Sequence, residues 1–290
     1  MEKLKPKKYL GQNFLQNSEI SRKIVDSITL DDCELVVEIG PGMGSLTNFL
    51  HEKVSNLILI EKDYEVCDFL KNQKSRLGEK IRKGIVKLFN EDVLSLEEDV
   101  KSILNSSFSY QIVGNLPFNI GKKILRIFLS GKEIKRPKYL TVMLQKEVAH
   151  QILGRKRSFL TFFTEFYSKK IKKICDVQKN CFYPIPKVDT TVLVIETKSD
   201  LGVSNLQDEL NITNLDQFWK FLKTLFFQKR KKIKNTIKLI VSEFPSFLPS
   251  EIQEIFEKRV EDLDISEISI LWRIYNESLG KVKDSRLMQS

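Results

Sequence analysis

The residues best suited to chemistry in this chain are Asn115, Leu116, Pro117 and Phe118, which follow directly after the apolar run 110–114. A short apolar run of this kind is typical of a buried strand. An amide oxygen at the end of such a strand can accept a hydrogen bond from an exocyclic amine, and an aromatic ring can stack on a flat heterocycle. Open α/β sheets bind their ligands at the carboxyl ends of the strands. The segment therefore predicts a site that holds the amino group of a nucleobase.

A glycine-rich turn at residues 38–47 indicates the second reactant. It follows the apolar run 35–37 and carries glycines at positions 40, 42 and 44, which let the backbone turn sharply and approach a ligand closely. Its spacing is G-x-G-x-G, not the G-x-G-x-x-G of dinucleotide-binding turns, and Pro41 removes one amide donor. The turn therefore favours a ligand without a pyrophosphate.

Acidic residues follow the next two predicted strands. Glu61 comes directly after the apolar run 56–60, where a carboxylate can bind both hydroxyls of a ribose. Asp92 lies just beyond a third predicted strand, 85–89, and suits the amino edge of an adenine. A tight turn beside ordinary surface acids would explain any one of these features, but three strand ends in register favour a single site. Ribose and adenine groups without a phosphate site describe S-adenosylmethionine better than NAD.

The elements that must position these residues alternate between helix and strand. Residues 18–28 have apolar positions at helical spacing, with Ser18 as the expected N-cap. Residues 139–145 form a further predicted strand. The extended segments 174–182 and 190–196 are joined by a short connection and predict an antiparallel hairpin at one edge of a mostly parallel sheet.

The last part of the chain contains only helical patterns. The chain becomes polar at 198–210, where we place the boundary between a catalytic domain, residues 1–200, and a small helical domain, residues 201–290. Within the second domain, five cationic side chains fall in six positions, namely Lys229, Arg230, Lys231, Lys232 and Lys234. Such a run repels itself unless an anion lies alongside, so it predicts a local phosphate-binding surface, with a merely solvated face as the alternative.

Composition agrees with an intracellular enzyme that handles an anion. The chain has 290 residues, of which 41% are hydrophobic and 30% charged, which is typical of a soluble globular protein of two domains. Its net charge of +10 favours polyanionic partners. No apolar run is long enough to span a membrane, and the basic N-terminus lacks the apolar segment of a secretory signal. We therefore expect a cytoplasmic protein.

Cysteine and histidine usage argues against a metal. The four cysteines are scattered without a Cys-x-x-Cys pair, and neither of the two histidines lies near one at ligand spacing. A zinc deaminase would also act on a base amine, but it needs such ligands. We expect no metal cofactor.

Five segments in the same order resemble the ribosomal small-subunit RNA adenine dimethyltransferase family over nearly the whole chain. Residues 11–15 resemble its N-terminal cofactor segment, and residues 38–47 its glycine motif. Residues 115–118 resemble its catalytic motif. Residues 182–189 resemble its proline-rich late motif, and residues 226–235 its basic C-terminal helix.

The resemblance implies a Rossmann-like class I SAM-dependent methyltransferase domain followed by a small all-α domain. The cofactor contacts that it implies are Asn13, Leu15, Gly40, Glu61, Asp92 and Asn115. It implies that Phe118 and Phe182 pack around a flipped target adenine. The implied reaction is dimethylation at N6 of two adjacent adenosines in a hairpin loop near the 3′ end of 16S rRNA. The implied partner is the 30S particle, with a role in small-subunit biogenesis, and we expect a monomer.

A mechanism follows as a hypothesis. The Asn115 amide oxygen and the Leu116 carbonyl accept the two N6 hydrogens, while Pro117 makes the turn rigid. When those hydrogens are held out of the ring plane, the nitrogen lone pair is directed at the sulfonium methyl. Positioning of this kind lowers the barrier by several kcal/mol, out of the ~7–11 kcal/mol that orientation can give. An adenine leaves its stack most easily in a loop, which favours a hairpin over a duplex as substrate.

The chain departs from the family pattern at a few positions. Phe118 stands where tyrosine is usual, which keeps the stacking face and drops a hydroxyl that we expect to be dispensable. Gly121 and Lys122 replace small polar residues, and Thr190 replaces serine. These changes affect local loop geometry and not the reaction.

Two other functions are compatible with parts of the sequence. The large-subunit RNA methylases that confer macrolide resistance form a sister group, but Gly11 before Gln12 and Leu116 before Pro117 favour the ribosome-biogenesis family. A non-catalytic RNA-binding or assembly factor, or a mitochondrial-type transcription factor of the same descent, is the second alternative. The intact glycine turn and Asn115 favour catalysis.

Overall fold

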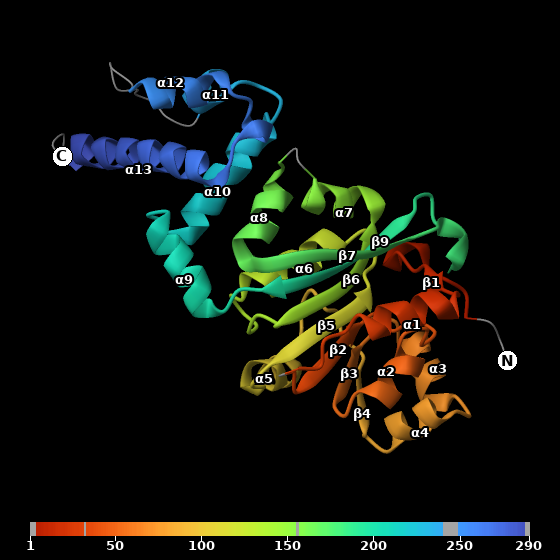
Figure 1. Cartoon of the computed structure of the whole chain (residues 1–290). Coiled ribbons are helices and arrows are strands. Elements are labelled where there is room, and N and C mark those ends of the chain that lie inside the picture. The colour runs from red at the N-terminus through yellow and green to blue at the C-terminus, as the bar shows by residue number, and fades with distance from the viewer. Residues whose placement is uncertain (1–3, 32, 155–156, 240–248, 288–290) are drawn as a thin grey trace. The chain divides into compact units, whose positions relative to one another are not determined.

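The computed structural model describes residues 4–31, 33–154, 157–239 and 249–287, and its elements form two compact units (Figure 1). We call the first, residues 1–150 and 167–199, the sheet unit. The second, residues 151–166 and 200–290, is the helical unit. The polar stretch at the predicted domain boundary contains a helix, α9 (Asp200–Glu209), at which the helical unit resumes. None of the described helices is both long and apolar enough to cross a membrane.

A seven-stranded sheet organises the sheet unit, in the order β4-β3-β2-β5-β6-β9-β7. Its strands are β2 (Leu35–Ile39), β3 (Leu57–Ile60), β4 (Val86–Phe89), β5 (Tyr110–Asn115), β6 (Tyr139–Gln145), β7 (Ser168–Val177) and β9 (Thr190–Thr197). The strands from β4 to β6 pair in parallel, whereas β9 is antiparallel to both β6 and β7. The predicted mostly parallel sheet with an antiparallel edge hairpin is therefore confirmed.

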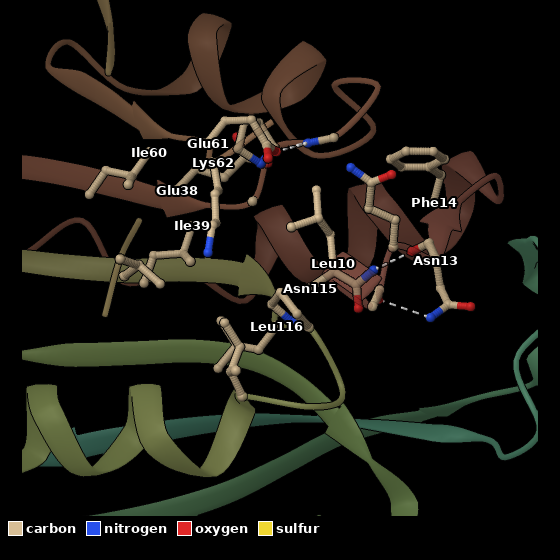
Figure 2. Close-up of a pocket in the computed structure, with 18 of the residues that line it drawn as sticks. Leu10, Asn13, Phe14, Glu38, Ile39, Ile60, Glu61, Lys62, Asn115 and Leu116 are labelled. Atoms are coloured by element: carbon tan, nitrogen blue, oxygen red, sulfur yellow. Dashed lines mark hydrogen bonds between the residues drawn. The ribbon is translucent and has the colours of Figure 1, made fainter. Parts of the chain in front are cut away.

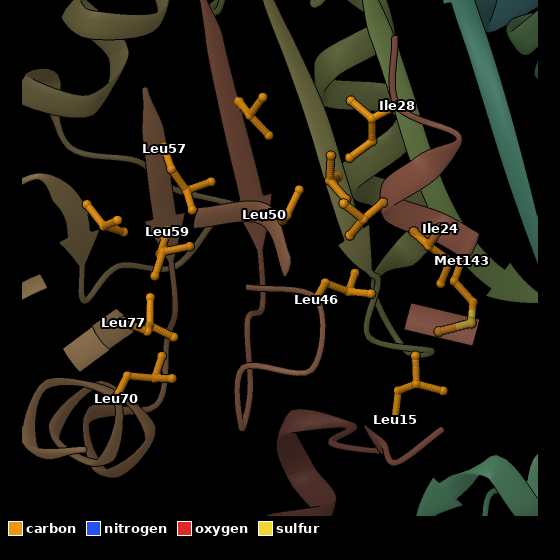
Figure 3. Close-up of a cluster of buried hydrophobic side chains, with 14 of the residues drawn as sticks. Leu15, Ile24, Ile28, Leu46, Leu50, Leu57, Leu59, Leu70, Leu77 and Met143 are labelled. Carbon is orange, nitrogen blue, oxygen red and sulfur yellow. The ribbon is translucent and has the colours of Figure 1, made fainter. Parts of the chain in front are cut away.

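Helices cover both faces of the sheet (Figure 1). They are α1 (Ser18–Asp26), α2 (Thr47–Lys53), α3 (Tyr64–Asn72), α4 (Arg76–Arg82), α5 (Glu98–Ser106), α6 (Gly121–Ser130) and α7 (Lys146–Leu153). Every residue of β2 and β3 is buried, as expected for strands that are covered on both sides. Figure 3 shows an apolar cluster of the sheet unit, to which Ile24 of α1, Leu50 of α2, Leu70 of α3 and Leu59 of β3 all belong.

Two predicted details of the sheet unit are wrong. The N-cap of α1 is Asn17 and not Ser18, because the Asn17 side chain accepts a hydrogen bond from the Ile20 amide at 3.0 Å. Strand β7 begins at Ser168, six residues before the predicted start. Its early residues include exposed lysines, which hide the apolar alternation but protect a sheet edge from pairing with another chain.

A second, two-stranded sheet joins the start of the chain to the late motif. Strand β1 (Phe14–Leu15) is antiparallel to β8 (Phe182–Tyr183), so that Leu15 pairs with Phe182. The short helical turns η1 (Lys8–Leu10) and η2 (Lys179–Cys181) precede these two strands. Residues 14 and 15 are thereby fixed within the sheet unit.

The described part of the helical unit is built around one aromatic core. Its helices are α8 (Phe159–Tyr167, shared with the sheet unit at its last residue), α9, α10 (Leu215–Phe227), α11 (Ile233–Thr236), α12 (Ser250–Glu257) and α13 (Ile265–Leu287), with the short turns η3 (Ile237–Leu239) and η4 (Val260–Asp262). Trp272 of α13 is fully buried, with ring centroids 5.4 Å from Phe218 and 5.6 Å from Phe221 of α10. The predicted all-helical character of this region is confirmed.

Candidate active site

A cavity lies in the sheet unit where β2, β3 and β5 end (Figure 2). Nine predicted catalytic and cofactor residues line it, namely Asn13, Leu15, Gly40, Glu61, Asp92, Asn115, Leu116, Pro117 and Phe118. They come from five separate segments. The parallel register of β2, β3, β4 and β5 brings four of these segments to one edge of the sheet, and the N-terminal segment with Asn13 and Leu15 is the fifth. The structure therefore brings these nine residues to one cavity, and the role of each residue stays a prediction.

Asn115 ends β5 with one half of its amide satisfied and the other half free. Its Nδ2 donates to the Asn13 carbonyl at 2.8 Å, which fixes the side-chain orientation. Its Oδ1 is buried and has no hydrogen-bond partner among the described residues. A buried acceptor without a donor costs free energy, so its retention at a cavity wall is typical of a group that meets a ligand.

Glu61 ties the glycine turn to the end of β3. One carboxylate oxygen accepts from the Gly42 amide at 3.4 Å and the other from the Asp63 amide at 2.9 Å. Burial raises the pKa of Glu61, although both amide hydrogen bonds act against that shift. The carboxylate therefore lies beside the glycine turn with acceptor capacity that suits two hydroxyl donors.

Asp92 is placed by Lys62, whose Nζ lies 2.8 Å from the Asp92 carboxylate. Burial alone would raise the pKa of Asp92, but the hydrogen bonds from Lys62 and from the Leu94 amide outweigh burial and lower it. Asp92 is therefore an ionised acceptor at neutral pH, as binding of an exocyclic amine requires.

Glu38 lines the same cavity and was missed as a site residue in the sequence. Its side chain is 1% exposed, and its Oε2 has no hydrogen-bond partner among the described residues. Burial raises the pKa of Glu38 to about 8, and the nearby charge of Glu61 acts in the same direction. The carboxyl group is therefore protonated at neutral pH. An acid inside the apolar run that leads into a glycine turn was the available signal.

Asp63 fastens the N-terminal segment to the end of β3 and was also missed. Its carboxylate accepts from Lys7 Nζ at 2.6 Å and from Gln12 Nε2 at 2.8 Å. Burial alone would raise the pKa of Asp63, but these hydrogen bonds and that from the Glu65 amide outweigh burial and lower it. Asp63 thus links the strand end that carries Glu61 to the segment that carries Asn13.

The glycine turn leaves space for a ligand. Gly40 lines the cavity with a φ of +64°, and a Cβ atom added there would meet no atom within 4 Å. Asn115 Oδ1, Glu61 and Asp92 border the same space. Glu61 and Asp92 are acceptors that fit the ribose hydroxyls and the adenine amino group of S-adenosylmethionine, and Asn115 Oδ1 is an acceptor for an amine. The described residues contain no grouping of three or more metal-ligand side chains.

Gly40→Ala should separate the cost of backbone strain from the loss of ligand space. Gly84, in the turn before β4, has a φ of +70° and equally open surroundings, but it lies outside the cavity. Both alanine variants should lose about 1–2 kcal/mol of unfolding free energy, because an L residue is strained in that region. Only Gly40→Ala should also weaken S-adenosylmethionine binding, by at least about tenfold in calorimetry. Equal affinities in the two variants would contradict the placement of the ligand beside Gly40.

The two predicted stacking residues lie in different surroundings. Phe118 is half-buried in the cavity wall. Phe182 is only 2% exposed, belongs to the apolar cluster of the sheet unit and is not part of the cavity lining. Stacking of Phe182 on an adenine stays a prediction.

The basic run of the helical unit is not a continuous helix, contrary to the expectation. Helix α10 ends at Phe227 and α11 begins at Ile233, so residues 229–232 form the turn between them. Buried Ile233 anchors the turn, and mutual repulsion of adjacent cations disfavours a helix through it. Lys232 and Lys234 both pair with Glu257, at 2.7 and 2.6 Å.

The other three members of the run, Lys229, Arg230 and Lys231, are exposed. Their side chains have no ion pair with any residue that the structure describes. The sequence also predicts a basic, substrate-facing loop at residues 155–157, of which residues 155 and 156 lie outside the described ranges. The third, Arg157, pairs with Glu165 and stacks on Phe162.

Comparison with known proteins gives consistent matches. The family model described as ribosomal RNA adenine dimethylase matches residues 3–270. A ribosomal RNA small subunit methyltransferase A of Malacoplasma penetrans is 35% identical over 253 residues, covering 86% of this chain and 82% of the relative. A protein of the same name from Aliarcobacter butzleri is 33% identical over 290 residues and covers 99% of both chains.

Two solved structures share the fold. A dimethyladenosine transferase from Plasmodium falciparum has a TM-score of 0.67 at 22% identity, covering 91% of this chain and 98% of that one. The 23S rRNA methyltransferase ErmE has a TM-score of 0.64 at 20% identity, covering 90% and 99%.

Proposed function

This chain belongs to the ribosomal RNA adenine dimethylase family, and we propose that it transfers methyl groups from S-adenosylmethionine to N6 of adenosines in small-subunit ribosomal RNA. The targets are two adjacent adenosines in a hairpin loop near the 3′ end of 16S rRNA, each of which receives two methyl groups. The enzyme acts as a cytoplasmic monomer on the 30S particle and contributes to its biogenesis. The observation that carries this proposal is the buried Asn115 Oδ1, which has no hydrogen-bond partner in the described part of the chain and lies in a cavity that Glu61 and Asp92 also line.

The residues that would hold the cofactor divide its recognition among them. Glu61 would accept from the ribose hydroxyls, and Asp92 from the adenine amino group. The glycine turn at Gly40 would lie against the cofactor, and the segment with Asn13 and Leu15 would close the cavity above it. S-adenosylmethionine supplies a methyl group on a positively charged sulfur.

The reaction depends on how the chain holds the target amine. For the first methyl, Asn115 Oδ1 and the Leu116 carbonyl accept hydrogen bonds from the two N6 hydrogens and hold them out of the ring plane, which directs the nitrogen lone pair along the line of attack. The methylated N6 would carry a positive charge and release one proton to water. For the second methyl, the one remaining N6 hydrogen bonds to one of the two acceptors. The hydrogen bond from Asn115 Nδ2 to Asn13 fixes the acceptor before the base arrives. Phe118 stacks on the adenine, which contributes about 1–3 kcal/mol to binding. Positioning, not a strong base, accounts for the rate.

Methyl transfer to three substrates tests the function. The protein is incubated with labelled cofactor and either unmethylated small subunits, free small-subunit RNA or large-subunit RNA, and modified adenosines are mapped by mass. We expect dimethylation of two adjacent adenosines in the small-subunit substrates, with partly assembled particles as the best of them. Modification of large-subunit RNA instead would place the chain with the resistance methylases, and no transfer to any substrate would refute catalysis.

Two lysines of the basic run pair with Glu257 and the other three cations of the run do not, so we expect the two groups to contribute unequally to RNA binding. Replacing Lys229, Arg230 and Lys231 together with glutamine should reduce the slope of log affinity against log salt by about 2, since each phosphate contact contributes about 0.7–0.9. Replacing Lys232 and Lys234 should change the slope by less than about 1, because Glu257 already pairs with both. Salt titrations of RNA binding measure both. An equal loss per charge would contradict that expectation.

A further inference from the structure

A surface hollow in the sheet unit contains lysines that no predicted role uses. Lys146 at the start of α7, Lys179 in η2 and Lys187 in the β8–β9 connection all line it, together with His150. The main chain holds the hollow in shape around Asp189. The Asp189 carboxylate accepts from the Lys179 amide at 3.0 Å, and its carbonyl accepts from the Lys146 amide at 2.9 Å.

The three ammonium groups of this hollow are unpaired. None of them has an ion pair or hydrogen bond with a residue in the described ranges. Two lysines of β7 differ, because Lys169 pairs with Glu196 at 2.8 Å and Lys173 with Asp176 at 2.7 Å. The hollow also contains the carboxylates of Asp189 and Glu147, so its excess charge is modest. Unpaired cations in one hollow repel one another unless an anion lies between them.

The hollow lies at the same edge of the sheet as Asn115. Asn115 pairs with Met143, and Gln145, which lines the hollow, follows only two residues further along β6, or about 7 Å. The β1–β8 pair gives a second connection, since Phe14 pairs with Tyr183, four residues before Lys187. Lys146 is therefore three residues along the chain from Met143, the partner of Asn115, and Lys187 is four residues from Tyr183, the partner of Phe14.

We propose that Lys146, Lys179 and Lys187 form a binding site for the RNA backbone, which takes phosphates next to the flipped adenosine. This inference rests on the proposed function and deepens it. Lysine binds phosphate as a point charge, and contacts to phosphates fix the register of a nucleic acid on a protein. The site holds the RNA strand on either side of the target adenosine, so the adenine enters the cavity from an RNA backbone that is held in one position.

The test is a triple variant, K146Q/K179Q/K187Q, with a matched control, K71Q/K74Q/K87Q. The control removes three exposed charges, on α3, the α3–α4 turn and the β4 edge of the sheet, whose ammonium groups have no ion pair with a described residue. Binding of a target hairpin RNA is measured as a function of salt, and methyl transfer is measured at varied RNA concentration.

The hollow variant should bind the hairpin at least about tenfold more weakly at 0.15 M salt, with a slope lower by about 2. Its KM for RNA should rise more than its kcat falls, while its affinity for S-adenosylmethionine and its unfolding midpoint match those of the control. Equal RNA binding in the two variants would overturn the proposal. So would a defect seen only with whole particles and not with the hairpin, which would indicate a protein contact. Failure of the wild type to methylate any RNA would count against the proposed function. The comparison of hairpin binding between the two variants would still decide whether the hollow binds RNA.

Discussion

Asn115→Ala is expected to lower the rate of methyl transfer at least about 100-fold while changing the affinity for S-adenosylmethionine only a few-fold. The size follows from the loss of one preorganised polar group at the reacting centre, which typically reduces kcat by about 10²–10³. The affinity should change little, because Glu61 and Asp92 also line the cavity and remain in place. Single-turnover transfer to the RNA hairpin and calorimetry with the cofactor measure the two quantities.

A second substitution at the same position separates the two halves of the amide. Asn115→Asp keeps an acceptor oxygen but loses the Nδ2 donor that contacts the Asn13 carbonyl at 2.8 Å. If the acceptor is what matters, the aspartate variant should retain more activity than the alanine variant. Equal losses would assign the effect to the orienting hydrogen bond, and turnover near wild type in Asn115→Ala would refute the proposed role of Asn115.

Glu38→Gln should stabilise the protein at alkaline pH and have little effect at acid pH. Burial raises the pKa of Glu38 to about 8 in the folded state, against 4.5 for an ordinary glutamate. Below pH 4.5 the carboxyl is protonated in both states, so the folded state loses nothing. As pH rises from 4.5 to 8, the unfolded chain releases the proton while the folded chain retains it, and stability falls. Above pH 8 both states are ionised and the loss levels off.

The size of this effect is on the order of 3–5 kcal/mol at pH 8.5, because each pKa unit corresponds to about 1.4 kcal/mol. Denaturant titrations at pH 5 and pH 8.5 should therefore show near-equal stabilities for wild type and Glu38→Gln at the lower pH only. Glu34, exposed and directly before β2, provides the control; its Oε2 accepts from the Phe108 amide at 3.0 Å, a bond that a glutamine oxygen can also accept. Glu34→Gln should change the unfolding free energy by less than about 0.5 kcal/mol at both values. A difference between Glu38→Gln and wild type that does not depend on pH would contradict a protonated Glu38.

The parallel part of the sheet was readable from the sequence because its strands are continuous apolar runs that end in polar residues. The prediction for β6, residues 139–145, agrees with the structure, and that for β5 differs only by including Asn115 in the strand. Once these runs are placed side by side, parallel register brings their polar ends together. The expected methyltransferase fold is confirmed, and the predicted cofactor residues meet at one cavity for this reason.

The features that were missed depend on contacts between distant segments. Asn17 caps α1 because of its local backbone, while Ser18 is an equally good capping type one position later. Asp63 looked like an ordinary acid after a strand, since its partners, Lys7 and Gln12, lie about 50 residues earlier. The break of the basic helix depends on the burial of Ile233, which no local pattern reveals.

The pairing of β1 with β8 has a consequence for synthesis of the chain. Leu15 and Phe182 are 182 − 15 = 167 residues apart, and their pairing closes a loop that contains most of the sheet unit. A nascent polypeptide emerging from the translation machinery cannot complete this pair until the second of those residues has been made. Strand β1 must therefore wait for β8 through more than half of translation, and the β1–β8 pair forms only after all the parallel strands have been made.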